Sequence, residues 1–173
     1  MDCGGSCSAC PQGCATTTNI SLGKTTSQSS NFSASNPYPS SKVVDGSVAS
    51  SSFNHTNLEP QPWWQVNLGS SSTVTSIEIT NRTGCSSCAG RIKKFKVFVS
   101  ANQVTSYTTA GHVFEYNNST GLKDGEVVTI NNLSGFGQYV RVWIDYGTTS
   151  GYLHFAEVLL VASQLSKAIA VNE

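Results

Sequence analysis

In the sequence VTSIEIT, residues 74–80, two isoleucines alternate with polar residues. A period of two is typical of a β-strand that buries one face. Related runs follow along the chain, separated by clusters of glycine, serine and asparagine. The runs are Ile92–Val99, Gly125–Ile130, Gln138–Ile144 and Phe155–Val161, and the predicted turns are Leu68–Ser72, Asn117–Gly121 and Gly135–Gly137. Short strands joined by such turns predict an all-β protein with an antiparallel β-sandwich or jelly-roll fold.

The composition indicates an extracellular module. Only 12% of the 173 residues are charged, against about 25% in typical soluble domains. Ten basic and ten acidic residues give a net charge of zero, whereas nucleic-acid binding normally requires a basic excess. We therefore predict no nucleic-acid partner, and we expect the basic run Arg91–Lys96 to be a solvated strand face. No apolar run approaches the ~20 residues of a transmembrane helix.

The chain divides into three regions. Residues 1–18 are a cysteine-rich N-terminal extension, residues 19–162 carry the strand pattern of one domain, and residues 163–173 form a C-terminal tail. Local disulfides, cross-links to another chain in an oligomer, and a zinc site all remain open for Cys3, Cys7, Cys10 and Cys14. We favour disulfides and a secreted or extracellular location. No apolar signal-peptide segment follows Met1. We therefore expect the sequence to be a part excised from a longer protein.

Residues 31–62 contain no long strand-like run and are rich in serine, asparagine and proline. Loops of this length inside a compact domain are uncommon and are often functional. Binding residues are therefore expected here first.

The order of several landmarks resembles that of discoidin-like domains, the superfamily of the coagulation factor C-domains. The landmarks are Leu22–Ser30, Val43–Gly46, Pro62–Gly69, Tyr139–Val142 and His154–Val158. The resemblance covers roughly residues 20–162 and implies the same sandwich fold.

Within this superfamily the chain is similar to F-type lectins, which place a histidine, a gap in the twenties and then Arg-x-Asp-x4-Arg/Lys. Here 26 residues separate His55 from Arg82, and Arg91 follows. The resemblance implies that these three side chains form a fucose-binding pocket. It also implies a disulfide between Cys85 and Cys88 in that pocket, as a rigid apolar platform against the sugar ring.

The chain departs from the family pattern at two places. Gly84 stands where the family has aspartate, and two residues separate cysteines that are adjacent in the family. Either the longer loop bulges and leaves Arg91 in place, or it reshapes the pocket. Both departures lie where the family reads its sugar.

These residue types suit a sugar. Histidine can donate from one ring nitrogen and accept at the other, and arginine offers a rigid fork of donors to adjacent hydroxyls. Phe53 is predicted as an aromatic wall. Taken singly, His55 would be an ordinary loop histidine, and a Cys-x-x-Cys pair is also typical of redox or zinc sites. We predict a sugar site because the spacing and the landmarks agree.

The resemblance further implies a structural calcium ion, held by Asp45 of an Asp-Gly turn and by Glu157 in the last strand. Additional oxygen ligands are implied for Lys42, Ser47, Ser52 and Ala156. Calcium takes 6–8 oxygens, so two carboxylates with carbonyl groups meet its needs. In the alternative, Asp45 only closes its turn and Glu157 is a surface charge.

The expected function is that of a calcium-dependent lectin, recognising terminal L-fucose on glycans and glycoproteins and meeting membranes only through surface glycans. The alternative is a discoidin-like adhesion or carbohydrate-binding module for a galactose-type sugar, a protein or a membrane surface. No enzyme is predicted, because His55 has no nucleophile partner and no paired carboxylates occur at motif spacing. Glycosylation sequons at Asn54 and Asn81 overlap the predicted site, so either the source does not glycosylate or these sequons are unused.

Overall fold

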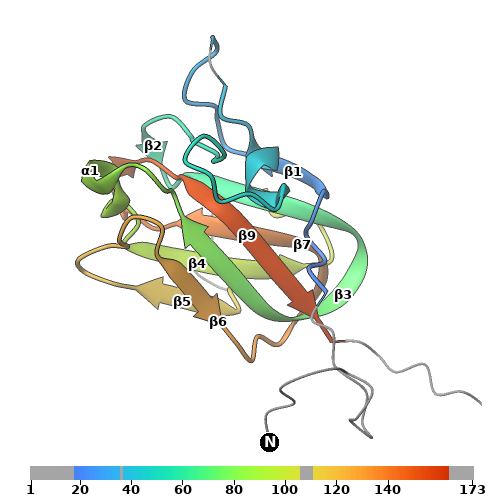
Figure 1. The fold of residues 1–173 in the computed structure, drawn as a ribbon. Coiled ribbons are helices and arrows are strands. Elements are labelled where there is room, and N and C mark those ends of the chain that lie inside the picture. Colours follow the sequence, from blue (N-terminus) through green and yellow to red (C-terminus); the bar gives the residue numbers. More distant parts are fainter. Residues whose placement is uncertain (1–17, 36, 106–110, 164–173) are drawn as a thin grey trace, which may run out of the picture.

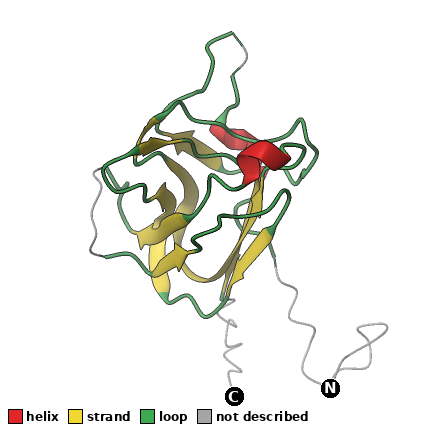
Figure 2. Cartoon of the chain, turned by 90° about the vertical axis from the view of Figure 1, so that its left-hand side faces the viewer, coloured by secondary structure: helices red, strands yellow, loops and turns green. Residues whose placement is uncertain are grey.

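The computed structural model describes residues 18–35, 37–105 and 111–163. The strands form two layers, with the helical segments and many loops at one end (Figures 1 and 2). The elements are β1 (Thr25–Gln28), η2 (Ser40–Val44), β2 (Glu59–Pro60), β3 (Trp63–Asn81), α1 (Ser86–Ala89), β4 (Lys94–Ser100), β5 (Phe114–Asn117), β6 (Val127–Ile130), β7 (Gly135–Ile144), β8 (Ser150–Gly151) and β9 (Phe155–Ala162). The predicted antiparallel all-β class is confirmed.

Several predictions lie outside the described residues. They concern the N-terminal extension with Cys3, Cys7, Cys10 and Cys14, and nearly all of the C-terminal tail. Within the described part, no helix is long and apolar enough to cross a bilayer.

The long strand β3 belongs to both layers. Its first part pairs with β1 and β7, through Trp64 opposite Gln28 and Val142, and β4 and β5 extend this layer in the order β1-β3-β7-β4-β5. Its second part pairs with β6 and β9, through Ile79 opposite Val128 and Val158. One bent strand therefore connects the two sheets of the sandwich.

The hydrophobic core fills the space between these layers. The inward positions of β3 are fully buried in both of its parts, and they pack in one cluster with β7 and β9: Trp64, Val66, Ile77, Ile79, Val140, Val142, Val158 and Leu160. Val43 and Val44 of η2 join this cluster, and the Trp64 indole Nε1 donates a 2.9 Å hydrogen bond to the Ser40 carbonyl. Burial of η2 in this way fixes the position of the Asp45-Gly46 turn that follows it.

Two predicted turns are wrong. Leu68–Ser72 lies inside β3, where the pairing with β7 shifts register between Asn67 and Ser72. Gly135–Gly137 begins β7. A Cβ on Gly137 would lie 2.4 Å from the Ser100 backbone, so this glycine serves a close strand contact rather than a turn.

The basic run is also not wholly a solvated face. Lys94 is exposed, but Lys96 on the same face is only 6% exposed. The Lys96 ammonium lies 3.0 Å from the Asp145 carboxylate, because a buried lysine is stable only when its charge is paired.

Candidate functional site

A hollow of about 220 Å³ lies at the loop-bearing end of the sandwich. Its walls bring together residues from separate loops: Phe32, Tyr38, His55, Arg82, Cys85, Cys88 and Arg91. Five of the six side chains predicted for the sugar site therefore line one cavity.

The loop holding His55 is fixed by backbone hydrogen bonds. The His55 amide donates to the Tyr38 carbonyl at 3.2 Å, and the Phe32 amide donates to the His55 carbonyl at 3.0 Å. His55 Nδ1 lies 2.7 Å from the Thr56 carbonyl oxygen, which can only accept, so Nδ1 carries the proton. Burial lowers the pKa of His55, and the Arg82 and Arg91 charges lower this pKa further. The imidazole is thus neutral, with Nε2 left as a hydrogen-bond acceptor.

Arg82 rests on an aromatic base. Its guanidinium carbon lies 3.8 Å from the centre of the Phe53 ring, and that ring stacks on Tyr38 at 4.7 Å. The Arg82 Nε is buried without a hydrogen-bond partner among the described residues, and burial is the main cause that lowers the pKa of Arg82. The Arg82 side chain also lines the hollow, so its guanidinium group is placed to donate to an incoming hydroxyl.

Phe53 does not have the predicted position of a pocket wall. It is only 4% exposed and lies beneath Arg82, where a cation–π contact orients the guanidinium. The aromatic side chains in the lining are Phe32 and Tyr38. No sequence pattern distinguishes Phe32, which is 46% exposed, from other loop aromatics.

Arg91 occupies the border of the hollow. Its guanidinium carbon lies 4.7 Å from the centre of the Tyr152 ring, which is itself 5.2 Å from the His55 ring. Despite the two extra residues between the cysteines, Arg91 shares one cavity with His55 and Arg82. The longer loop is accommodated as the short helix α1.

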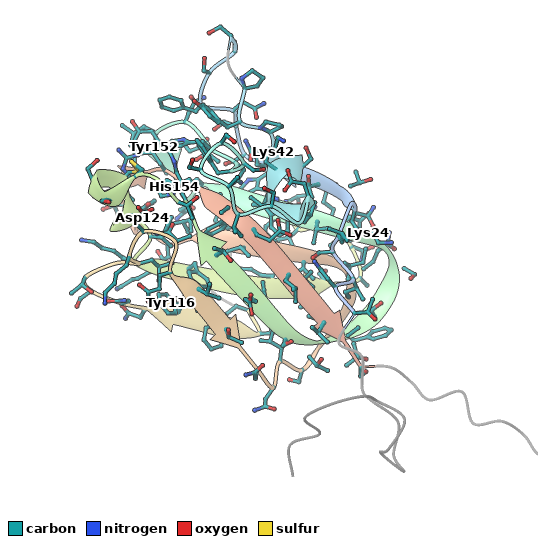
Figure 3. All side chains as sticks on the ribbon, in the orientation of Figure 1. Lys24, Lys42, Tyr116, Asp124, Tyr152 and His154 are labelled. Carbon is teal, nitrogen blue, oxygen red and sulfur yellow. A yellow bond between two sulfur atoms is a disulfide. The ribbon has the colours of Figure 1, made fainter. Side chains whose placement is uncertain are left out.

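Cys85 and Cys88 form a disulfide across α1, with their Cα atoms 5.4 Å apart. The predicted pairing is therefore present, and sulfurs joined in this way offer no thiolate to zinc. Cys88 is buried, whereas Cys85 is partly exposed in the hollow. Figure 3 shows the sulfurs at the same end of the molecule as the labelled Tyr152, His154 and Asp124.

Asp124 supplies a carboxylate near the position that Gly84 leaves without one. Its two oxygens accept hydrogen bonds of 3.4 Å from the Cys85 amide and the Ser86 hydroxyl. Its negative charge raises the pKa of Arg82, against the larger lowering by burial. Gly84 has φ +74°, and a Cβ there would lie 2.8 Å from the Ser50 Cβ. An aspartate at position 84 would therefore be strained, whereas Asp124 comes to this region from a separate loop.

The two sequons at the site are structural. Asn54 and Asn81 are both fully buried. Asn54 accepts from the Phe155 amide at 2.7 Å, and Asn81 donates to the Ala89 and Lys123 carbonyls at 3.1 and 2.8 Å. These side chains hold the site loops together and are inaccessible to a glycan in the folded protein.

His154 lies beneath the hollow, fully buried, with its ring 5.4 Å from that of His55. Neither of its ring nitrogens bonds to another described residue. Burial is the main cause that lowers the pKa of His154 to about 3, and the neighbouring His55 and arginines add to it. Because an unfolded histidine takes up a proton below about pH 6.5, the chain loses stability as the pH falls from 6.5 towards 3.

Replacing His154 with phenylalanine is expected to remove this acid sensitivity. At about pH 5 the buried neutral histidine costs roughly 2 kcal/mol relative to about pH 7.5. Urea unfolding measures the free energy of unfolding of the variant and of the parent at both pH values. From about pH 7.5 to about pH 5, the variant should gain about that amount of stability relative to the parent. Contributions of other groups cancel in this difference, so an identical pH dependence of both proteins would contradict the assignment.

The Asp45-Gly46 turn lies against β9 at Glu157. The Gly46 amide donates to Glu157 Oε2 at 3.2 Å, whereas Oε1 is buried without a hydrogen-bond partner in the described part. Glu157 is only 8% exposed and is therefore not a surface charge. Burial raises its pKa to about 7, and the Asp45 charge adds to this rise.

Ser52 contacts Asp45 through its hydroxyl oxygen, whereas Ser47 and Lys42 approach Asp45 through nitrogen atoms. Asp45 accepts a 2.8 Å hydrogen bond from the Ser52 hydroxyl and a 3.0 Å bond from the Ser47 amide, and the Lys42 ammonium lies 3.4 Å from it. Ala156 is the residue skipped where the register of β3 and β9 shifts, and a bulge frees such a residue from the ladder. No group of three or more His, Cys, Asp or Glu side chains able to hold a metal occurs in the described ranges. A cation here would depend on two carboxylates together with carbonyl and hydroxyl oxygens.

The chain is similar to a known domain family and to several known proteins. A family model of the F5/F8 type C class, described as a NedA-like, galactose-binding domain, matches residues 42–142. A pentraxin fusion protein of Xenopus laevis is 31% identical over 131 residues, covering 72% of this chain and 29% of that protein. Fucolectin-6 of Anguilla japonica is 28% identical over 134 residues, covering 68% of this chain and 60% of that protein. The chain thus spans less than two thirds of either relative.

Two solved structures share the fold at moderate identity. The lectin domain of lectinolysin, complexed with Lewis B antigen, has a TM-score of 0.66 at 28% identity, over 85% of this chain and 98% of that domain. A fucose-binding module of Streptococcus pneumoniae has a TM-score of 0.66 at 26% identity, over 85% and 96% respectively.

Proposed function

Because the chain belongs to the NedA-like, galactose-binding family of F5/F8 type C domains and is a discoidin-like F-type lectin domain, we propose that it binds terminal L-fucose on glycans through His55, Arg82 and Arg91. Lectins and carbohydrate-binding modules are non-enzymatic binding domains, which confirms the expectation that the chain is not an enzyme. As a lectin, it would meet its glycans and glycoproteins outside the cell.

The observation that carries the proposal is a neutral acceptor beside two guanidinium groups in one small cavity. A monosaccharide presents adjacent hydroxyls that donate and accept in fixed directions. His55 Nε2 accepts from one hydroxyl, and Arg82 and Arg91 donate to neighbouring oxygens. Tyr38 and the disulfide offer apolar surface to the sugar ring.

Such a site binds weakly. Each neutral hydrogen bond contributes about 0.5–1.5 kcal/mol, and one to a charged group contributes up to about 3. Three convergent groups therefore give micromolar to millimolar dissociation constants for a single sugar.

A galactose-type sugar is the second candidate, because the matching family is described as galactose-binding. Both sugars offer vicinal hydroxyls, and Gly84 and the widened cysteine loop lie where F-type lectins read fucose. Selectivity between the two depends on how α1 shapes the hollow.

Calcium is proposed as a structural ion between the Asp45-Gly46 turn and β9. The supporting observation is the buried oxygen of Glu157 that lacks a partner, next to a second carboxylate. Asp45, Glu157 and the freed carbonyl of Ala156 are the residues suited to hold it. A bound cation would neutralise the carboxylates and tie the site loop to the last strand.

A glycan array with and without a calcium chelator tests the function. We expect the chain to bind glycans that end in L-fucose, and to bind them less well after chelation. No binding to any fucosylated glycan would contradict fucose recognition. Binding confined to galactose-terminated glycans would support the second candidate instead.

A further inference from the structure

A second hollow, of about 550 Å³, adjoins the first and shares Arg91 with it. Tyr152 connects the two: its ring lies 4.7 Å from the Arg91 guanidinium carbon and 5.2 Å from the His55 ring. The pairing of β2 with β8, Glu59 opposite Gly151, brings Leu58 to the same wall. A sugar bound at His55 therefore has open, lined space beside it for the residue to which it is attached.

The second hollow is positively charged. Arg91 and Lys93 both line it, both are exposed, and no aspartate or glutamate is among its lining residues. Neither cation forms an ion pair within the described ranges, and the nearby Asp145 carboxylate is paired with Lys96. Two uncompensated cations in one concave surface attract an anion.

The remaining wall of the second hollow is held in place. The Tyr146 hydroxyl lies 2.7 Å from the Tyr152 carbonyl and 3.0 Å from the Arg91 carbonyl, so this side chain connects the segment after β8 with the end of α1. Burial raises the pKa of Tyr146 to about 12, so its phenol stays neutral. The backbone segments that carry Arg91 and Tyr152 are therefore held together by Tyr146.

We propose that this second hollow binds an acidic sugar residue, bearing a carboxylate or a sulfate, that is joined to the sugar in the first hollow. This inference rests on the proposed function of the His55 hollow. Arg91 can present two donors to one anion, and Lys93 adds a point charge. The partly exposed ring of Tyr152 and the exposed Leu58 provide apolar surface for the sugar ring.

The test compares four probes by calorimetric titration. These are L-fucose, a neutral fucosylated trisaccharide, and the same trisaccharide carrying either one sialic acid or one sulfate. At about 0.05 M salt we expect at least one acidic trisaccharide to bind about three- to tenfold more tightly than the neutral one, and this gain to vanish near 0.5 M salt. The acid that gives the gain identifies the anion.

Lys93→Gln is expected to abolish the gain without changing the affinity for L-fucose. Lys94→Gln is the matched control, because Lys94 is the next residue, exposed and outside the second hollow, and it should keep the gain. Equal binding of neutral and acidic trisaccharides, or equal losses in both variants, would overturn the inference. A failure to bind L-fucose would instead contradict the proposed function itself.

Discussion

Replacing Arg82 with alanine is expected to weaken L-fucose binding by at least about 100-fold, because two hydrogen bonds from a charged donor contribute about 1.5–3 kcal/mol each. The guanidinium is already oriented by Phe53 in the free protein, so little freedom is lost when the sugar binds. Arg82→Lys should also bind poorly, since an ammonium cannot reproduce the planar fork. Calorimetric titration with L-fucose measures both effects.

Two controls separate binding from folding. Lys24→Ala removes a cation from the start of the domain, which Figure 3 shows on the other side of the molecule from Tyr152 and Asp124, and it should bind like the parent. The melting temperature of Arg82→Ala should stay within a few degrees of the parent, because Arg82 is not part of the core cluster. An affinity retained to within about twofold would place the sugar elsewhere on the chain.

Calcium is expected to raise the melting temperature by about 5–10 °C at about pH 8, and by much less at about pH 5.5. The reason is Glu157, whose pKa of about 7 in the folded chain exceeds its ordinary value of 4.5. Its ionised form therefore lowers the stability of the fold. The loss of stability is largest above pH 7 and becomes smaller as the pH falls from 7 to 4.5. A cation binds the ionised form, so its stabilisation is largest where the cost is largest.

Glu157→Gln is the informative variant. In chelator at about pH 8 it should melt above the parent, because the amide carries no charge to bury. It should no longer respond to calcium. Thermal unfolding of both proteins with calcium and with chelator, at about pH 8 and about pH 5.5, gives the comparison. A parent protein indifferent to calcium at about pH 8 would rule out the structural ion.

Part of the site could be predicted from the sequence because its signal is local. Sequence spacing alone gives the interval from His55 to Arg82 and the position of the two cysteines. The structure brings these side chains to one cavity. Phe32, Asp124 and Tyr152 could not be found in that way. Each comes from a different loop, and only their contacts in three dimensions distinguish them from other loop residues.

The predicted turns at Leu68–Ser72 and Gly135–Gly137 failed for a related reason. Glycine and serine mark a turn as readily as they mark a bend or a close approach of strands. Only the packing of β7 against Ser100 shows that Gly137 marks a close approach of strands and not a turn.

By itself the sequence determined the all-β class, since a period of two fixes which side chains of a strand face the core. It also determined the residue types available for binding. The tertiary structure alone decided how they are arranged: β3 bends between two sheets, the bulge at Ala156 frees this residue from the strand ladder beside Glu157, and Asp124 from a separate loop accepts a hydrogen bond from the Cys85 amide. Strand periodicity is a property of neighbours in the chain, whereas a binding site is made by residues far apart in it, and its geometry depends on how the whole sandwich packs.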